Sequence, residues 1–198
     1  WLSFARVFLF GARDVWFVVG IPIYFYAVLS DGTKAGTQTA FFAIGKFMAI
    51  WIILYGLVQA NAPRLLRAKQ RGQGALIKDS ATWVLGLAAV PAVLALVLSL
   101  MVSPTSVTTS VLVIGLLLFG AVFAVNSALH SYLILAFTDS ERVTMDVGFY
   151  YMSNAAGRLL GTVLSGLSYQ LGGVWLCLAL ASAMLIISAL GAHKLRSF

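Results

Sequence analysis

Long apolar runs follow one another along the chain and are separated by short polar breaks. The six runs cover about residues 3–29, 37–62, 81–102, 107–136, 146–170 and 174–195. A helix of about 20 apolar residues crosses the hydrocarbon core of a bilayer, and it satisfies its backbone hydrogen bonds within itself. The breaks carry turn-forming residues, such as Ser30-Asp31-Gly32, Ser103-Pro104 and Gly172-Gly173. The pattern predicts an all-α membrane protein that forms one bundle of six transmembrane helices.

Composition supports this interpretation and limits the kinds of ligand and partner that we expect. Of 198 residues, 61% are hydrophobic and 10% are charged, and the mean hydropathy is +0.98; these values lie outside the range of soluble domains. The single cysteine, Cys177, sits in an apolar run, so neither a disulfide nor a cysteine metal site is expected. We expect no cofactor and no metal. The net charge of +7 does not indicate nucleic-acid binding, because the cations cluster between apolar runs.

The cations in the connections predict how the chain is oriented in the membrane. Cytoplasmic connections retain Lys and Arg, and eight such residues fall on one side: Arg64, Arg67, Lys69, Arg71 and Lys78 in the basic loop 63–80, Arg142 in the fourth connection, and Lys194 and Arg196 in the tail. The other side has only Lys34. We therefore expect a multi-pass protein of the cell (inner or plasma) membrane with both ends of this chain in the cytoplasm. The loop itself is interpreted as an orientation signal that contacts lipid headgroups.

Four charged residues lie too deep in the predicted spans to belong to a loop, namely Arg13, Asp14, Lys46 and Arg158. At about 1.5 Å per residue, the three cations lie about 14 to 18 Å inside their spans, near the middle of the membrane. Placing one of them against lipid costs at least about 2.5 kcal/mol. They must therefore face one another, a partner or water. One carboxylate leaves an excess of two positive charges, which predicts a binding site for an anion.

Other polar residues share helix faces with these charges. Arg6 lies seven residues before Arg13, so it is either the cytoplasmic entry step of a cationic stripe or a side chain that reaches the headgroups. Four-residue spacing pairs Asn126 with His130 and Asn154 with Arg158. The candidate substrate contacts are Arg13, Lys46, Arg158, Asn126, Asn154 and Tyr150.

Each candidate has a structural alternative. Neighbours on a helix point about 100° apart, so Arg13 and Asp14 need not pair; Arg13 either binds substrate or forms a structural ion pair. Asp14 either stays ionised in such a pair, as we expect, or carries protons. Arg158 fits an interhelical hydrogen bond as well as an anion site. For His130 a neutral interhelical hydrogen bond is favoured over proton transfer.

The order of the spans repeats. In each set of three spans, the first helix is polar or charged, the second has one cation at mid-depth, and the third is uncharged. The two triplets have opposite orientations, which predicts a 3+3 inverted repeat of the kind from which secondary transporters are built. Gly157, Gly161 and Ser165 form a stripe of small residues that allows another helix to approach closely.

Three stretches resemble a known family: FGARDVWFVVGIPIYFY, LVQANAPRLL and MDVGFYYMSNAAGRLLGTVLSGLSYQLGG. They are similar to the C-terminal six-helix half of the major facilitator superfamily, specifically to its organoarsenical efflux (ArsJ-type) members. The resemblance implies a central cavity lined by the helices of each six-helix half except its third and its sixth, which are peripheral. It also implies export of 1-arseno-3-phosphoglycerate, and a degenerate basic gating motif in APRLLRAKQRG. The N-terminal six helices are absent here, which implies a missing half, or a second copy, as partner.

The sequence thus predicts part of a secondary active transporter that exports an anionic organic compound in arsenic resistance. Because it begins at Trp1 without Met, we expect a fragment. The alternatives are a carrier of another organic anion or drug, and a non-transporting membrane subunit. An intramembrane serine protease is disfavoured, because no histidine lies at the depth of Ser165 on a later span. We expect no enzymatic activity.

Overall fold

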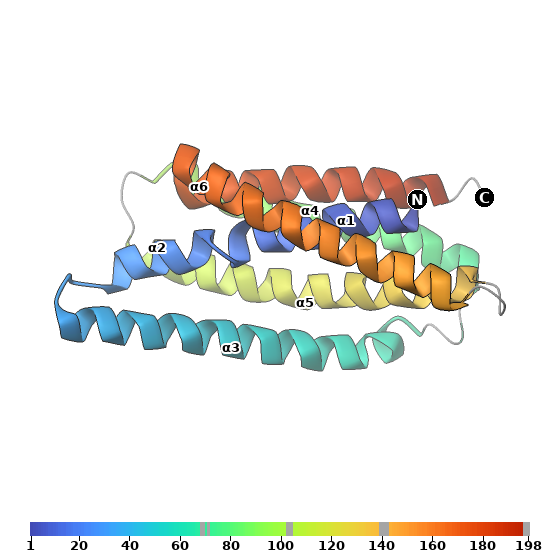
Figure 1. The fold of residues 1–198 in the computed structure, drawn as a ribbon, viewed down its shortest axis with the longest axis horizontal. Helices are drawn as coiled ribbons and strands as arrows, with labels where there is room; N and C mark the ends of the chain where they lie inside the picture. The colour runs from blue at the N-terminus through green and yellow to red at the C-terminus, as the bar shows by residue number, and fades with distance from the viewer. Residues whose placement is uncertain (68–69, 71, 102–104, 139–142, 196–198) are drawn as a thin grey trace.

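The computed structural model describes residues 1–67, 70, 72–101, 105–138 and 143–195, and its regular structure in these ranges is helical (Figure 1). The helices are α1 (Leu2–Phe17), α2 (Gly20–Leu29), α3 (Lys34–Leu65), α4 (Gln73–Ser99), α5 (Ser106–Phe137) and α6 (Val143–Lys194). Within the described residues, five helical segments are long and apolar enough to cross a membrane, α1 and α2 counting together as one segment. The all-α prediction is confirmed, and a multi-pass membrane protein fits these lengths.

Helix α6 is 52 residues long and consists of two arms that meet at Gly173. Gly173 has φ 70° and ψ −159°, a combination that only glycine adopts without strain. Figure 1 shows the first arm reaching one end of the bundle and the second arm returning beside it. The Ser168 hydroxyl donates to the Cys177 sulfur at 3.2 Å across this turn. The sequence break expected at Gly172-Gly173 coincides with the kink.

The first predicted span, 3–29, is interrupted between α1 and α2. Val19 has φ −120° and ψ −50°, outside the helical region. Pro22 lies in the first turn of α2, where its missing N–H removes no helical hydrogen bond. The Gly20 N–H donates to the hydroxyl oxygen of Ser165 on α6 at 3.1 Å. A side chain from another helix therefore satisfies a backbone donor that the break exposes.

The core lies around α1, which packs along α6 and is mostly buried. Aromatic rings join it to α3 and α5: the Trp16 centroid lies 5.2 Å from that of Phe119 and 5.8 Å from that of Trp51. Helix α3 buries only Ala40, Trp51 and Ala62 completely, and it follows α5 along the outside of the bundle (Figure 1). The Trp51 indole N–H donates to the Leu116 carbonyl at 2.8 Å and attaches α3 to α5.

The uncharged second arm of α6 packs one face against other helices of the bundle and leaves residues such as Ile186 and Leu190 exposed on the other. Its serines bond to the backbone of other helices. The Ser188 hydroxyl donates to the Ala5 carbonyl of α1 at 2.7 Å, and the Ser182 hydroxyl donates to the Ala88 carbonyl of α4 at 2.9 Å. Lack of charge in this arm therefore reflects burial against α1 and α4, since an apolar helix suits a packed interior as well as lipid.

The basic connection between α3 and α4 is shorter than the predicted loop 63–80, because α3 continues to Leu65 and α4 begins at Gln73. Both termini lie at the same end of the bundle as this connection (Figure 1). Arg64 and Arg67 belong to the described part. Other orientation signals and breaks lie outside the described residues, namely Lys69, Arg71, Arg142, Arg196, Ser103-Pro104 and 139–141.

Gly157 and Gly161 bring the backbones of α6 and α1 into contact. A methyl group at Gly157 would collide with the Val7 carbonyl oxygen, and one at Gly161 would collide with that of Gly11. We therefore expect Gly161→Ala to lower the free energy of unfolding by about 1 to 3 kcal/mol, as overpacking does. Unfolding in mixed micelles, followed by tryptophan fluorescence, measures the change.

Gly166 of the same helix is the matched control, because a methyl group there would meet nothing within 4 Å. Gly166→Ala should leave stability unchanged or raise it, since alanine favours the helix by about 1 kcal/mol over glycine. Equal effects of the two substitutions would contradict the close approach of α1 and α6.

Candidate functional site

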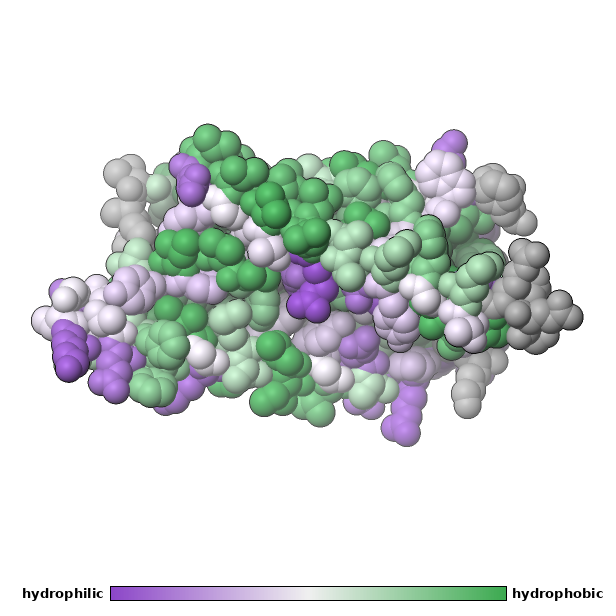
Figure 2. All heavy atoms as spheres, in the orientation of Figure 1, coloured by the Kyte–Doolittle hydropathy of each residue, from purple (hydrophilic) through white to green (hydrophobic). Residues whose placement is uncertain are grey.

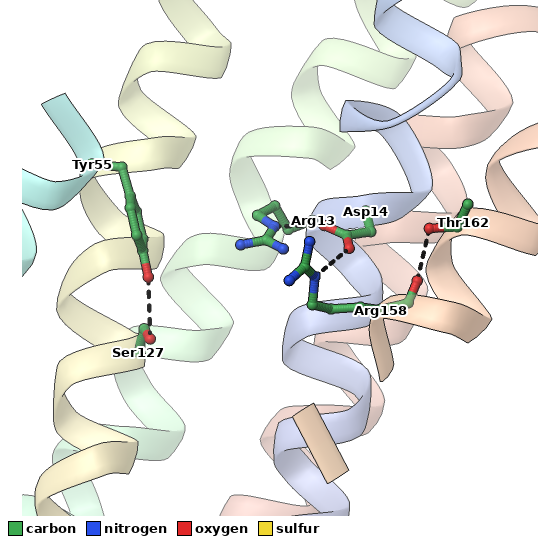
Figure 3. Close-up of polar contacts among 6 residues, drawn as sticks. All are labelled: Arg13, Asp14, Tyr55, Ser127, Arg158 and Thr162. Carbon is green, nitrogen blue, oxygen red and sulfur yellow. Dashed lines mark hydrogen bonds and ion pairs between the residues drawn. The ribbon is translucent and has the colours of Figure 1, made fainter. Parts of the chain in front are cut away.

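Asp14 is a buried carboxylate that binds two guanidinium groups. Its side chain is 2% exposed. Oδ1 accepts a hydrogen bond from Nε of Arg13 at 2.6 Å, and Oδ2 accepts one from Nε of Arg158 at 3.1 Å (Figure 3). Two of the three predicted mid-depth cations thus meet Asp14, the acid predicted at mid-depth. The ion pairs join α1 to the first arm of α6, and they leave one uncompensated positive charge in the group.

The pairing of Arg13 with Asp14 differs from the expectation that neighbouring residues point apart. The Cα–Cβ bonds do diverge on a helix, but the long arginine side chain bends back so that its Nε reaches the carboxylate. For Arg13, the structural ion pair that the sequence left open is therefore present. Arg158 likewise forms a polar contact between helices, with a carboxylate partner.

Both arginines contact Asp14 through Nε alone. Among the described residues, no hydrogen-bond acceptor contacts their terminal Nη groups. Arg158 keeps 59% of its side chain exposed, and Arg13 keeps 13%. In Figure 3 both guanidinium groups lie on the side of α1 that faces Tyr55 of α3. The cluster therefore presents unused charged donors at the surface of the bundle.

Aromatic rings surround the Arg13 end of the cluster. Its guanidinium carbon lies 5.2 Å from the Phe10 centroid and 5.5 Å from that of Phe123, distances at which a cation is attracted to a ring face. Tyr55 packs against Phe123 at 5.7 Å between centroids, and its hydroxyl donates to the Ser127 hydroxyl oxygen at 3.3 Å. Helix α3 thus contributes a tyrosine to this region.

The Arg13–Asp14–Arg158 cluster reaches a surface of the bundle that is otherwise largely hydrophobic. Figure 2 shows hydrophilic side chains gathered at the centre of one face, between α6 and α5, with hydrophobic side chains around them. Polar groups at this depth are costly against lipid. This face therefore requires contact with water, a solute or another polypeptide.

Lys46 does not join the cluster. It is exposed on α3 and lies nine residues before Tyr55, which is at the level of Arg13. At about 1.5 Å per residue, Lys46 is about 13 Å farther along the bundle. The structure therefore does not bring Lys46 to the level of Arg13, and its role as a substrate contact stays a prediction.

Asn126 and His130 are both fully buried in α5. The Asn126 amide donates to the Trp83 carbonyl of α4 at 3.2 Å and to the Val122 carbonyl at 3.0 Å. Asn126 therefore joins α5 to α4 and is not accessible as a substrate contact. Neither ring nitrogen of His130 has a hydrogen-bond partner in the described structure, so the interhelical bond predicted for it is not formed.

Arg6 is buried, with 3% of its surface exposed, and does not reach the headgroups or an open entrance. Its guanidinium carbon lies 4.2 Å from the Phe10 centroid and 4.0 Å from the Tyr150 centroid, while Nη1 donates to the Ser127 carbonyl at 3.4 Å. Phe10 also faces Arg13, so the two arginines share one stripe as predicted. Tyr150 is 1% exposed and covers Arg6 instead of lining open space.

Asn154 lies between Tyr150 and Arg158 on α6 and is partly buried, and its Oδ1 has no partner in the described part. The sequence did not single out Tyr55, Gln59 or Ser127, although the Gln59 amide also donates to the Ser127 hydroxyl oxygen at 3.4 Å. The sequence signal that could have identified this polar region is the four-residue spacing of Phe123, Ser127 and Ser131, which places them on one face of α5.

Comparison of the chain with protein-family models, with curated proteins and with solved structures found no match.

Removing the Asp14 charge tests the cluster. Asp14→Asn leaves Arg13 and Arg158 facing each other without a carboxylate, and removal of one partner from a buried ion pair costs about 3 to 5 kcal/mol. We expect about 3 kcal/mol, because solvent screens the exposed Arg158. The loss in the free energy of unfolding is measured by unfolding in mixed micelles. A second substitution, Arg13→Gln, made in the Asp14→Asn variant should recover part of this loss.

Asp31→Asn is the control, because Asp31 lies in the exposed turn before α3, where it accepts hydrogen bonds from Thr33. Its effect should be much smaller. Stability that is equal in Asp14→Asn and in the unmodified protein would show that the ion pairs do not hold α1 against α6.

Proposed function

We propose that the chain is the six-helix part of a secondary transporter that moves an organic anion across the membrane. The observation that carries this proposal is the pair of arginines that share Asp14 while their Nη groups remain unbonded. The geometry combines a fixed position for each guanidinium with free donors for a ligand. The positive charge left in the cluster favours an anion over a neutral solute.

Substrate binding at this site uses the shape of guanidinium. Each group can donate two parallel hydrogen bonds to a phosphate, arsenate or carboxylate, and it stays charged when water is removed. Because Asp14 takes only Nε of each arginine, an anion occupies the Nη groups without displacing the carboxylate. Asp14 is then the residue that orients both arginines and couples α1 to α6.

The substrate we favour is an organoarsenical such as 1-arseno-3-phosphoglycerate, exported in arsenic resistance. This choice depends on the resemblance of the three quoted stretches to organoarsenical efflux carriers of the major facilitator superfamily. The arsenate, phosphate and carboxylate groups of this compound suit two guanidinium groups. The same site chemistry accommodates another organic anion, so a carrier with a different anionic substrate is the nearest alternative.

The architecture proposed with this function is a 3+3 inverted repeat that forms one half of a carrier. The kink at Gly173 divides α6 into two arms and supports a six-helix count. The exposed α3 and the polar centre of the face in Figure 2 suit coverage by a second six-helix half or a second copy of the chain. Both ends of the chain are proposed to face the cytoplasm.

Arg158→Gln tests the site, because Arg158 has the most exposed guanidinium of the cluster. Hydrogen bonds to a charged group contribute about 1.5 to 3 kcal/mol, so transport of an anionic substrate at low concentration should fall about tenfold or more. Export is measured in cells that express the complete reading frame, with the arsenate ester of phosphoglycerate, phosphoglycerate itself and a neutral triose as solutes. Membrane insertion should be retained.

Lys34→Gln is the control, since it also removes one positive charge, at an exposed lysine at the start of α3 and outside the basic connection. It should leave transport at the unmodified rate. Equal loss in both variants, or equal export of the neutral triose, would overturn the anion site. A complete protein that inserts and folds but moves none of these solutes would favour a non-transporting membrane subunit.

A further inference from the structure

Arg6 is a buried cation without an acidic partner in the part of the chain that the structure describes. Two rings cover the faces of its guanidinium, and one terminal nitrogen donates a long bond of 3.4 Å to the Ser127 carbonyl. Its Nε has no hydrogen-bond partner. We propose that the free edge of Arg6, together with His130, holds a small inorganic anion, which in a cell is chloride.

His130 supplies the second observation. It is fully buried, and neither ring nitrogen has a partner among the described residues. Arg6 bonds to the Ser127 carbonyl, and His130 follows Ser127 by three residues, close to one turn of α5. Ser131, the next residue, bonds the Tyr150 hydroxyl at 3.1 Å, and the Tyr150 ring covers Arg6. His130 therefore belongs to the shell around the guanidinium.

These unbonded groups include donors that require an acceptor. The Nε–H of Arg6 is one, and a neutral imidazole carries another N–H. A buried donor that lacks an acceptor costs about 1 to 3 kcal/mol, and an isolated buried charge costs far more. Water would accept these hydrogen bonds but would leave the charge uncompensated. A bound anion accepts the hydrogen bonds and neutralises the charge.

The surroundings indicate the size of the anion. Leu129, Leu133 and Tyr150 pack around this region and are 0–1% exposed. A monatomic ion suits such close packing better than an organic acid does. Arg6 lies seven residues from Arg13, about 10 Å along α1. The chloride site is thus separate from the proposed transport site, and either can exist without the other.

Thermal unfolding in different salts tests the site. The protein in detergent is heated in sodium chloride or in sodium gluconate at equal ionic strength, and tryptophan fluorescence reports unfolding. A ligand that binds only the folded state raises the midpoint as its concentration rises. We expect a higher midpoint in chloride for the unmodified protein. Arg6→Gln should abolish the difference, and the control Arg64→Gln should retain it.

An equal midpoint of the unmodified protein in the two salts would overturn the proposal. A chloride dependence that survives in Arg6→Gln would overturn it as well, because the ion would then bind elsewhere. If Arg6→Gln does not fold, His130→Phe provides the comparison, since it removes one donor and keeps a buried ring. That variant should need several-fold more chloride for the same shift, and an unchanged dependence would count against the site.

Crystals grown in sodium bromide give a direct measurement on the unmodified protein. Bromide scatters anomalously, so a peak beside Nε of Arg6 would identify the anion. Density there without anomalous signal would show water and overturn the proposal. The result is independent of transport, so it separates this site from the one at Arg158.

Discussion

The structure depends on one buried carboxylate that satisfies two cations from different helices. Asp14 accepts one hydrogen bond from Nε of Arg13, on its own helix, and another from Nε of Arg158 on α6. At this depth an isolated guanidinium or carboxylate is strongly disfavoured, so the three groups require one another. The glycine contacts beside them bring α1 and α6 close enough for the Arg158 bond to form. Charge and packing therefore stabilise the same helix pair.

Hydrophobic pattern alone predicted the helical class and the break at Gly173, because run length and glycine pairs report directly on local structure. It also identified Arg13, Lys46 and Arg158 as cations that must face one another, a partner or water. It could not predict the pairing of Arg13 with Asp14, which depends on the bend of a flexible side chain. It did not give the position of Lys46 relative to the cluster, because the packing of Trp51 against α5 and α1 positions α3.

The surroundings of Arg6 could not be predicted from the sequence either. Its neighbours Phe10, Ser127, Tyr150 and His130 come from three helices, and helical spacing relates only residues within one helix. An arginine near the end of a span normally extends to the headgroups, but Tyr150 of the first arm of α6 and the Ser127 carbonyl of α5 contact this one. Burial of Tyr150 and Asn126 has the same origin: both residues lie on helix faces that the bundle closes.

The interruption between α1 and α2 has a mechanical consequence. A continuous helix resists bending because each backbone hydrogen bond must stretch, whereas at Val18 and Val19 the ladder is already open. Asp14 secures the inner piece to α6, whereas the outer piece is held separately, by the bond from Gly20 to Ser165 and by its buried residues Ile21, Tyr24 and Phe25. The outer piece can therefore take a different direction from α1 without breaking the ion pairs of Asp14.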